Sequence, residues 1–124
     1  MNLNQITISV VDLERSIDFY EKLGLRLIVK ALPNYARFEM DQGVSTFSLH
    51  KVDKPLEGTG VWIYFELEDL DDSVRKLLES GFVFEELPTN MPWLWREARL
   101  KDPDNHQLIL YFAGDNRKNP PWRI

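Results

Sequence analysis

The fold of this chain is decided by the stretch Gln5-Ile6-Thr7-Ile8-Ser9-Val10-Val11-Asp12-Leu13, which continues through Glu14 to Gly24. The same pattern returns as Trp62-Ile63-Tyr64-Phe65-Glu66-Leu67-Glu68-Asp69-Leu70, which continues to Gly81. Asp12 corresponds to Asp69 and Gly24 to Gly81, an offset of 57 residues in both cases. A fixed period over a strand and a helix indicates a duplicated module.

The first copy has the pattern of a strand followed by a helix. Apolar and polar residues alternate over residues 5–11, as in a half-buried strand. Asp12 suits the N-cap of a helix, and Gly24 suits its C-terminal stop. Apolar residues recur between them at helical spacing and predict a buried stripe: Leu13, Ile17, Tyr20 and Leu23.

The remaining elements give each module the order β-α-β-β-β. A second helix is predicted over residues 70–80 with Asp69 as its cap, and a turn is predicted over residues 102–105. Further strands are predicted over residues 25–30, 35–40, 44–52, 61–67, 82–86, 93–101 and 107–112. Residues 53–60 form a linker, residues 87–92 a loop with two prolines, and residues 114–124 an extended tail. The chain is therefore predicted to be a single domain, residues 1–124, made of two modules (about 3–52 and 60–113) and this tail.

Composition excludes several classes of function. The chain has 124 residues, a net charge of −5 and no cysteine. The acidic balance argues against a nucleic-acid partner, and the lack of cysteine removes disulfides and thiolate ligands. No apolar run is long enough to span a membrane, and no signal peptide is recognised. We therefore expect a cytoplasmic protein with neither nucleic acid nor membrane as partner.

The strands predict where a ligand would bind. One face of the first and last strand of each module is apolar and should pack on a helix. The fold class expected is α+β, with two βαβββ modules forming curved mixed sheets around a cavity that binds a small molecule. The opposite faces carry polar and aromatic residues that would line this cavity: Gln5, Thr7, Ser48, His50, Trp62, Tyr64, Glu66, Gln107, Ile109 and Tyr111.

Several segments together resemble the vicinal oxygen chelate superfamily. These are Val11–Tyr20 with Leu23-Gly24, Phe65–Asp71, and Pro92–Asp104 with its Asp102-Pro103-Asp104-Asn105 turn. The superfamily includes glyoxalase I, bleomycin-resistance proteins, fosfomycin-resistance enzymes and extradiol dioxygenases. The resemblance implies the glyoxalase/bleomycin-resistance fold and a homodimer.

The resemblance also implies where metal ligands would lie. Metal-dependent members carry His, Gln or Glu at four strand positions, which correspond here to Gln5, Ser48, Trp62 and Ile109. Only Gln5 is an acceptable ligand, because indole and aliphatic side chains offer no lone pair to a cation. The first hypothesis is therefore a binder without metal or cofactor, similar to the bleomycin-resistance branch. Its ligand-binding residues would be Gln5, Ser48, His50, Trp62, Tyr64, Ile109 and Tyr111.

Two other interpretations stay open. One is a glyoxalase-like lyase or isomerase, or a dioxygenase-like enzyme, with a rebuilt site that uses Gln5, His50 and Glu66. The other is a dimeric scaffold whose cavity Trp62 fills. Other expected roles are a solvent-facing His106, a docking Trp122 in the tail, additional aromatic contacts from Trp93 and Trp95, and an anion-binding Arg37 or Arg96.

Overall fold

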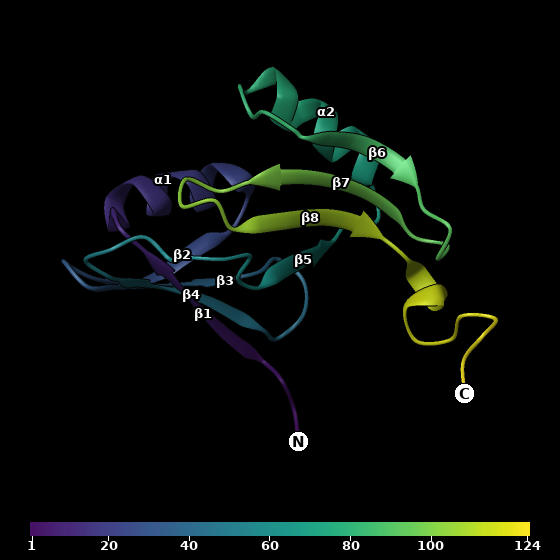
Figure 1. The fold of residues 1–124 in the computed structure, drawn as a ribbon, viewed down its shortest axis with the longest axis horizontal. Helices are drawn as coiled ribbons and strands as arrows, with labels where there is room; N and C mark the ends of the chain where they lie inside the picture. Colours follow the sequence, from purple (N-terminus) through teal and green to yellow (C-terminus); the bar gives the residue numbers. More distant parts are fainter. The chain divides into compact units, whose positions relative to one another are not determined.

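The computed structural model describes all 124 residues, and the chain divides into two compact units, Met1–Gly58 and Thr59–Ile124. Each unit contains one four-stranded mixed sheet and one α-helix (Figure 1). This is the predicted βαβββ arrangement, so the fold class is confirmed. No helix of the chain is long and apolar enough to cross a membrane.

The first unit follows the predicted order of elements. In its sheet the order is β1-β4-β3-β2, with β1 parallel to β4 and the other neighbours antiparallel. Its elements are β1 (Gln5–Val10), α1 (Leu13–Leu23), β2 (Arg26–Ala31), β3 (Tyr35–Glu39) and β4 (Thr46–Lys51).

Both predicted ends of α1 are confirmed. The Asp12 carboxylate accepts a hydrogen bond from the Arg15 backbone N–H at 3.1 Å, which satisfies one of the free donors of the first turn. Gly24 closes the helix at a φ of 117°, a conformation that favours glycine. The buried stripe packs on the sheet through Tyr20, whose ring centroid lies 4.8 Å from that of Phe47.

The second unit repeats the same sheet order, β5-β8-β7-β6, with β5 parallel to β8. Figure 1 shows β8 between β5 and β7, and a short 3-10 helix beyond its end. Its elements are β5 (Trp62–Glu66), α2 (Leu70–Glu79), β6 (Glu86–Asn90), β7 (Arg96–Lys101), β8 (Gln107–Phe112) and η1 (Gly114–Arg117).

The prediction for the sixth strand was wrong. Residues 82–85 are not a strand. The Phe82 N–H still closes α2 by donating to the Leu77 carbonyl at 3.0 Å, and contact with β7 begins only at Glu85, whose N–H donates to the Arg99 carbonyl at 2.8 Å. The strand β6 begins at Glu86, the last residue of the predicted strand, and its other residues were predicted as loop. It tolerates Pro88 because it lies at the edge of the sheet and shifts register between Glu86 and Thr89, so no ladder hydrogen bond has to be given up there.

Three smaller predictions were also wrong. The Asp69 side chain does not cap α2, because it accepts the Ser73 hydroxyl at 3.0 Å instead of a backbone N–H. The seventh strand begins at Arg96, since the preceding residues form a turn in which Leu94 has a φ of 66°. The tail is not wholly extended, because it begins with the 3-10 helix η1.

His106 does not face solvent as predicted. It is 6% exposed, and its backbone N–H donates to the Asp102 carboxylate at 2.8 Å. This bond folds the predicted turn, in which Asn105 adopts the left-handed conformation at a φ of 65°. The tight turn thus brings the imidazole into the protein interior.

Candidate functional site

One face of the second sheet gathers four aromatic side chains, which we call the aromatic face: Trp62, Tyr64, Trp95 and Tyr111. Strand register places them together, because Tyr64 lies opposite Ile109 and Glu66 lies opposite Tyr111. Tyr64 meets the rings of Trp95 and Tyr111 edge-on, at centroid distances of 5.9 and 5.5 Å. Trp95 and Tyr111 are themselves stacked at 4.8 Å. Such geometries are favourable for aromatic pairs, and they fix the orientation of the rings.

The aromatic face has an open part and a buried floor. Trp62 is 50% exposed and Tyr64 is 41% exposed, whereas Ile109 and Tyr111 are buried. Trp62 and Tyr64 share one face of β5, and neighbouring apolar groups exposed on one face are a feature of binding sites. A ligand at this face would contact Trp62 and Tyr64 directly, with Ile109 and Tyr111 as their support.

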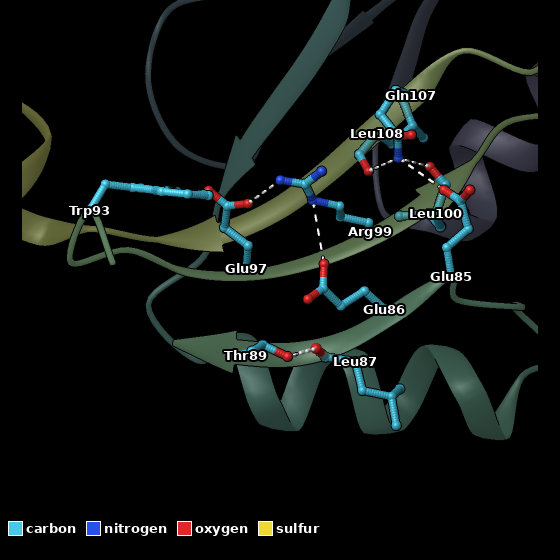
Figure 2. A network of polar contacts seen from close by, with 10 residues as sticks. All are labelled: Glu85, Glu86, Leu87, Thr89, Trp93, Glu97, Arg99, Leu100, Gln107 and Leu108. Carbon is cyan, nitrogen blue, oxygen red and sulfur yellow. Dashed lines mark hydrogen bonds and ion pairs between the residues drawn. The ribbon is translucent and has the colours of Figure 1, made fainter. Parts of the chain in front are cut away.

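A charged network supports this face from β7 (Figure 2). Glu97 is only 1% exposed, and its two carboxylate oxygens accept from Trp93 Nε1 at 2.7 Å and from an Arg99 amino group at 3.0 Å. Arg99 Nε also lies 3.5 Å from a Glu86 oxygen, and its guanidinium carbon lies 5.4 Å from the Trp62 ring centroid. The buried carboxylate therefore positions both an indole and an arginine.

Sequence reasoning missed Arg99 and Glu97. It singled out Arg96, whose side chain instead bonds to Asp71, at 2.6 and 2.9 Å, and to Asn90. The signal was present in the alternation of β7, since Glu97 and Arg99 share the strand parity of Trp95.

The two tyrosines of the aromatic face have raised pKa values. Burial raises the pKa of Tyr64, and the negative charge of Glu97 adds to this, while Arg99 acts in the opposite direction. Burial is also the main cause that raises the pKa of Tyr111, followed by the charge of Glu66. Both phenols therefore stay neutral at physiological pH, which suits contact with a ligand better than proton abstraction.

Glu66 holds the tail of the chain. One of its oxygens accepts the backbone N–H groups of Ala113 at 3.2 Å and Gly114 at 3.0 Å. The other lies 3.2 Å from Arg117 Nε. Because both carboxylate oxygens have protein partners, Glu66 is occupied in fixing η1 to the end of β8.

The first unit presents a polar face in place of an aromatic one. Gln5 Nε2 donates to the buried Ser48 hydroxyl at 2.7 Å, and Oε1 of the same side chain accepts from the Thr46 hydroxyl. The phenol oxygen of Tyr35 lies 2.8 Å from Ser48 Oγ and accepts from Arg37 Nε, also at 2.8 Å. His50 is exposed and lies opposite Tyr35 in the strand register. The polar face is defined by Gln5, Ser48, Tyr35 and Arg37.

The residues at the four family metal positions do not fit a divalent cation. Both functional atoms of Gln5 are engaged by Ser48 and Thr46, and the Ser48 hydroxyl is buried between two partners. Trp62 and Ile109 supply no ligand atom. No group of three His, Cys, Asp or Glu side chains that could hold a metal ion occurs in the chain.

A surface hollow of about 440 Å³ lies elsewhere in the first unit. Its lining comes from Val11–Glu14, Leu32, Pro33 and Lys51, and includes none of the predicted ligand residues. Asp12 serves there as the helix cap. The chemistry of the two sheet faces is therefore the better guide to a ligand site than this hollow.

With this fold and these strand positions, the chain belongs to the glyoxalase/bleomycin resistance protein/dioxygenase superfamily, whose sequence model matches residues 2–110. The match covers both units and agrees with the duplicated βαβββ architecture.

Three similar proteins show what the chain resembles. A probable trivalent organoarsenical cleaving enzyme of Bacillus subtilis is 27% identical over 94% of this chain and 83% of its own length. The uncharacterised protein YraH of the same species is 29% identical over 90% of this chain and 98% of its own. A solved glyoxalase/bleomycin resistance protein/dioxygenase from Nocardioides is 22% identical, with a TM-score of 0.79 over 100% of this chain and 89% of the other. The likeness to this last structure shows the fold alone.

Proposed function

We propose that the protein binds a planar aromatic small molecule without a metal ion, through the aromatic face of the second unit. The observation that carries this proposal is the pair of open rings, Trp62 and Tyr64, above a fixed floor. Trp62 occupies a position at which metal-dependent superfamily members are expected to carry a metal-coordinating side chain. An indole at that position supplies a stacking surface instead of a lone pair.

The contacts around Trp62 favour a planar ligand. Arg99 approaches the indole and is itself restrained by Glu97, so the ring is held in place before a ligand arrives. Restraint of this kind lowers the entropic cost of binding. Each aromatic contact with a ligand would add about 0.5–1.5 kcal/mol beyond the burial of apolar area.

A matched pair of probes tests this proposal. Calorimetry with 2-naphthol and with decahydro-2-naphthol, both in EDTA, compares flat and saturated rings that carry the same hydroxyl group. We expect 2-naphthol to bind more tightly, and Trp62→Leu to weaken it about five- to tenfold. Phe112→Leu is the control, because Phe112 is 41% exposed and, as the neighbour of Tyr111 in β8, lies on the opposite side of the sheet from the aromatic face. Equal affinity for both alcohols, or equal losses in both variants, would overturn the proposal.

A second candidate is an enzyme, and the organoarsenical cleaving relatives favour it. Trivalent arsenic is a soft centre that thiolates bind well, and this chain has no cysteine to provide one. The rebuilt site from Gln5, His50 and Glu66 is also disfavoured, because Gln5 and Glu66 are already engaged by protein groups. Release of inorganic arsenic from a trivalent arylarsenical by the purified protein would favour the enzyme over the binder.

A further inference from the structure

We propose that the polar face of the first unit carries an oxyanion site, in which Arg37 and the Tyr35 hydroxyl bind a small-molecule carboxylate or phosphate. This site goes beyond the aromatic binding proposed above, because it lies in the other unit and uses different chemistry.

Arg37 has donors to spare. Its Nε donates to Tyr35, and its guanidinium lies over the Tyr35 ring at 5.5 Å from the centroid. It has no ion-pair partner, whereas Arg26 on the same sheet is paired with Glu39. Its side chain is exposed, so the terminal amino groups are open to a ligand. A guanidinium presents these donors in a planar fork that matches a carboxylate or phosphate.

A count of hydrogens places one further donor beside Arg37. Gln5 and Arg37 supply N–H donors to Ser48 and Tyr35, while the two hydroxyls share a single contact with each other. Each hydroxyl has one hydrogen, so one of the two hydrogens remains for another acceptor. Ser48 is fully buried, whereas Tyr35 is half-buried, so the arrangement that avoids an unsatisfied buried donor has Ser48 donate to Tyr35. The Tyr35 hydrogen then points to a ligand held by Arg37.

The electrostatics of Tyr35 agree with an anion-binding role. Burial raises its pKa, but hydrogen bonds with Ser48 and Arg37 and the charge of Arg37 outweigh burial, and the net pKa is lowered. These partners favour negative charge at the phenol oxygen. The positive charge of Arg37 would likewise stabilise an oxyanion placed beside the phenol.

The test uses three small probes on the full chain at constant ionic strength. Inorganic phosphate and acetate represent the two possible oxyanions, and acetamide is the neutral match of acetate. Backbone amide shifts of residues 35–37 and 46–48 report binding by NMR. We expect phosphate or acetate, or both, to bind, and acetamide not to bind. A stronger response to phosphate or to acetate shows whether the site prefers a phosphate or a carboxylate group.

Two arginine variants make the test specific. Arg37→Gln should weaken oxyanion binding about ten- to a hundredfold, since charged hydrogen bonds are removed. Arg26→Gln should leave it unchanged, because that arginine is already paired with Glu39. Arg37→Lys, which keeps the charge and the fold but loses the planar fork, should bind at an intermediate level. No response of the parent to either oxyanion, or an equal loss in the Arg26 variant, would overturn the proposal.

Discussion

The guanidinium carbon of Arg99 lies 5.4 Å from the centroid of the Trp62 indole, and the same guanidinium donates to the buried Glu97 carboxylate at 3.0 Å. A charge buried in the sheet thereby controls an exposed ring on its surface. An arginine over an indole face contributes about 0.5–1 kcal/mol at an exposed site. The relationship makes Glu97 a positioning residue for the aromatic face.

Removal of Glu97 should destabilise the protein more than removal of its neighbour Glu86. Glu97→Ala leaves both Trp93 Nε1 and Arg99 without their acceptor, and we expect the free energy of unfolding to fall by about 3 kcal/mol. Glu86→Ala removes only a 3.5 Å contact from a more exposed carboxylate and should cost less than about 1 kcal/mol. Urea unfolding of both variants provides the comparison. Similar losses in the two variants would contradict the role of Glu97.

Tyr35 should ionise before Tyr64 and Tyr111 as the pH rises. Its pKa is lowered in the folded chain, whereas those of Tyr64 and Tyr111 are raised. Ultraviolet difference absorbance should show an early tyrosinate transition that Tyr35→Phe removes. An unchanged early transition in that variant would assign it to another residue.

The lowered pKa of Tyr35 also predicts a pH dependence of stability. A depressed folded-state pKa contributes stability that is complete above the unfolded value of 10.0 and is lost as the pH falls through the folded-state pKa. We compare the free energy of unfolding of the parent with that of Tyr35→Phe. The parent should gain stability relative to the variant as the pH rises from the folded-state pKa of Tyr35 to 10.0. Urea unfolding at a series of pH values measures it, and a difference that decreases with pH would contradict the assignment.

Loss of Glu66 should release the start of the tail. Glu66→Ala removes the acceptor of the Ala113 and Gly114 backbone N–H groups and the partner of Arg117. Hydrogen exchange at residues 113–117 should become faster, with a loss of about 1–2 kcal/mol in stability. Glu68→Ala is the control, because this exposed carboxylate has no such role. Unchanged exchange in Glu66→Ala would show that other contacts hold η1.

We propose that the protein is a homodimer, as its resemblance to superfamily members implies. Light scattering coupled to size exclusion should give twice the 14.6 kDa mass of the chain. Trp122, exposed in the tail, is the residue whose substitution would weaken a dimer held by the docking tail. A monomeric mass across a range of micromolar concentrations would contradict the proposal.

Local patterns predicted most of the architecture. The strand and helix pattern of residues 5–24 returns 57 residues later, so the second copy supported the prediction made from the first. The alternation of residues 5–11 and the cap at Asp12 are local signals, and the structure contains both the strand and the cap. Alternation also placed Trp62 and Tyr64 on one face of β5, opposite Gln107 and Ile109. These features depend on chain periodicity and on single hydrogen bonds within a turn.

The features that sequence reasoning missed depend on where each residue lies in the folded chain, which local patterns do not show. Glu66 was considered for chemistry, but its acceptor atoms are occupied by Ala113 and Gly114, which are far along the sequence. The strand β6 was hidden by Pro88, which is tolerated only because its edge position demands no N–H donor. Glu97 is a charged residue that becomes buried because Trp93 and Arg99 satisfy it together.

Metal content and aromatic binding, measured on the same sample, show directly whether the protein binds a planar ligand without a metal ion. The protein, purified without a histidine tag, is analysed for divalent cations and then titrated with 2-naphthol before and after treatment with EDTA. Binding without a metal ion predicts substoichiometric metal, the same affinity in both titrations, and a weaker affinity in Trp62→Leu. A stoichiometric divalent cation that is lost in His50→Ala, together with 2-naphthol binding that disappears in EDTA, would show instead that binding depends on a metal ion.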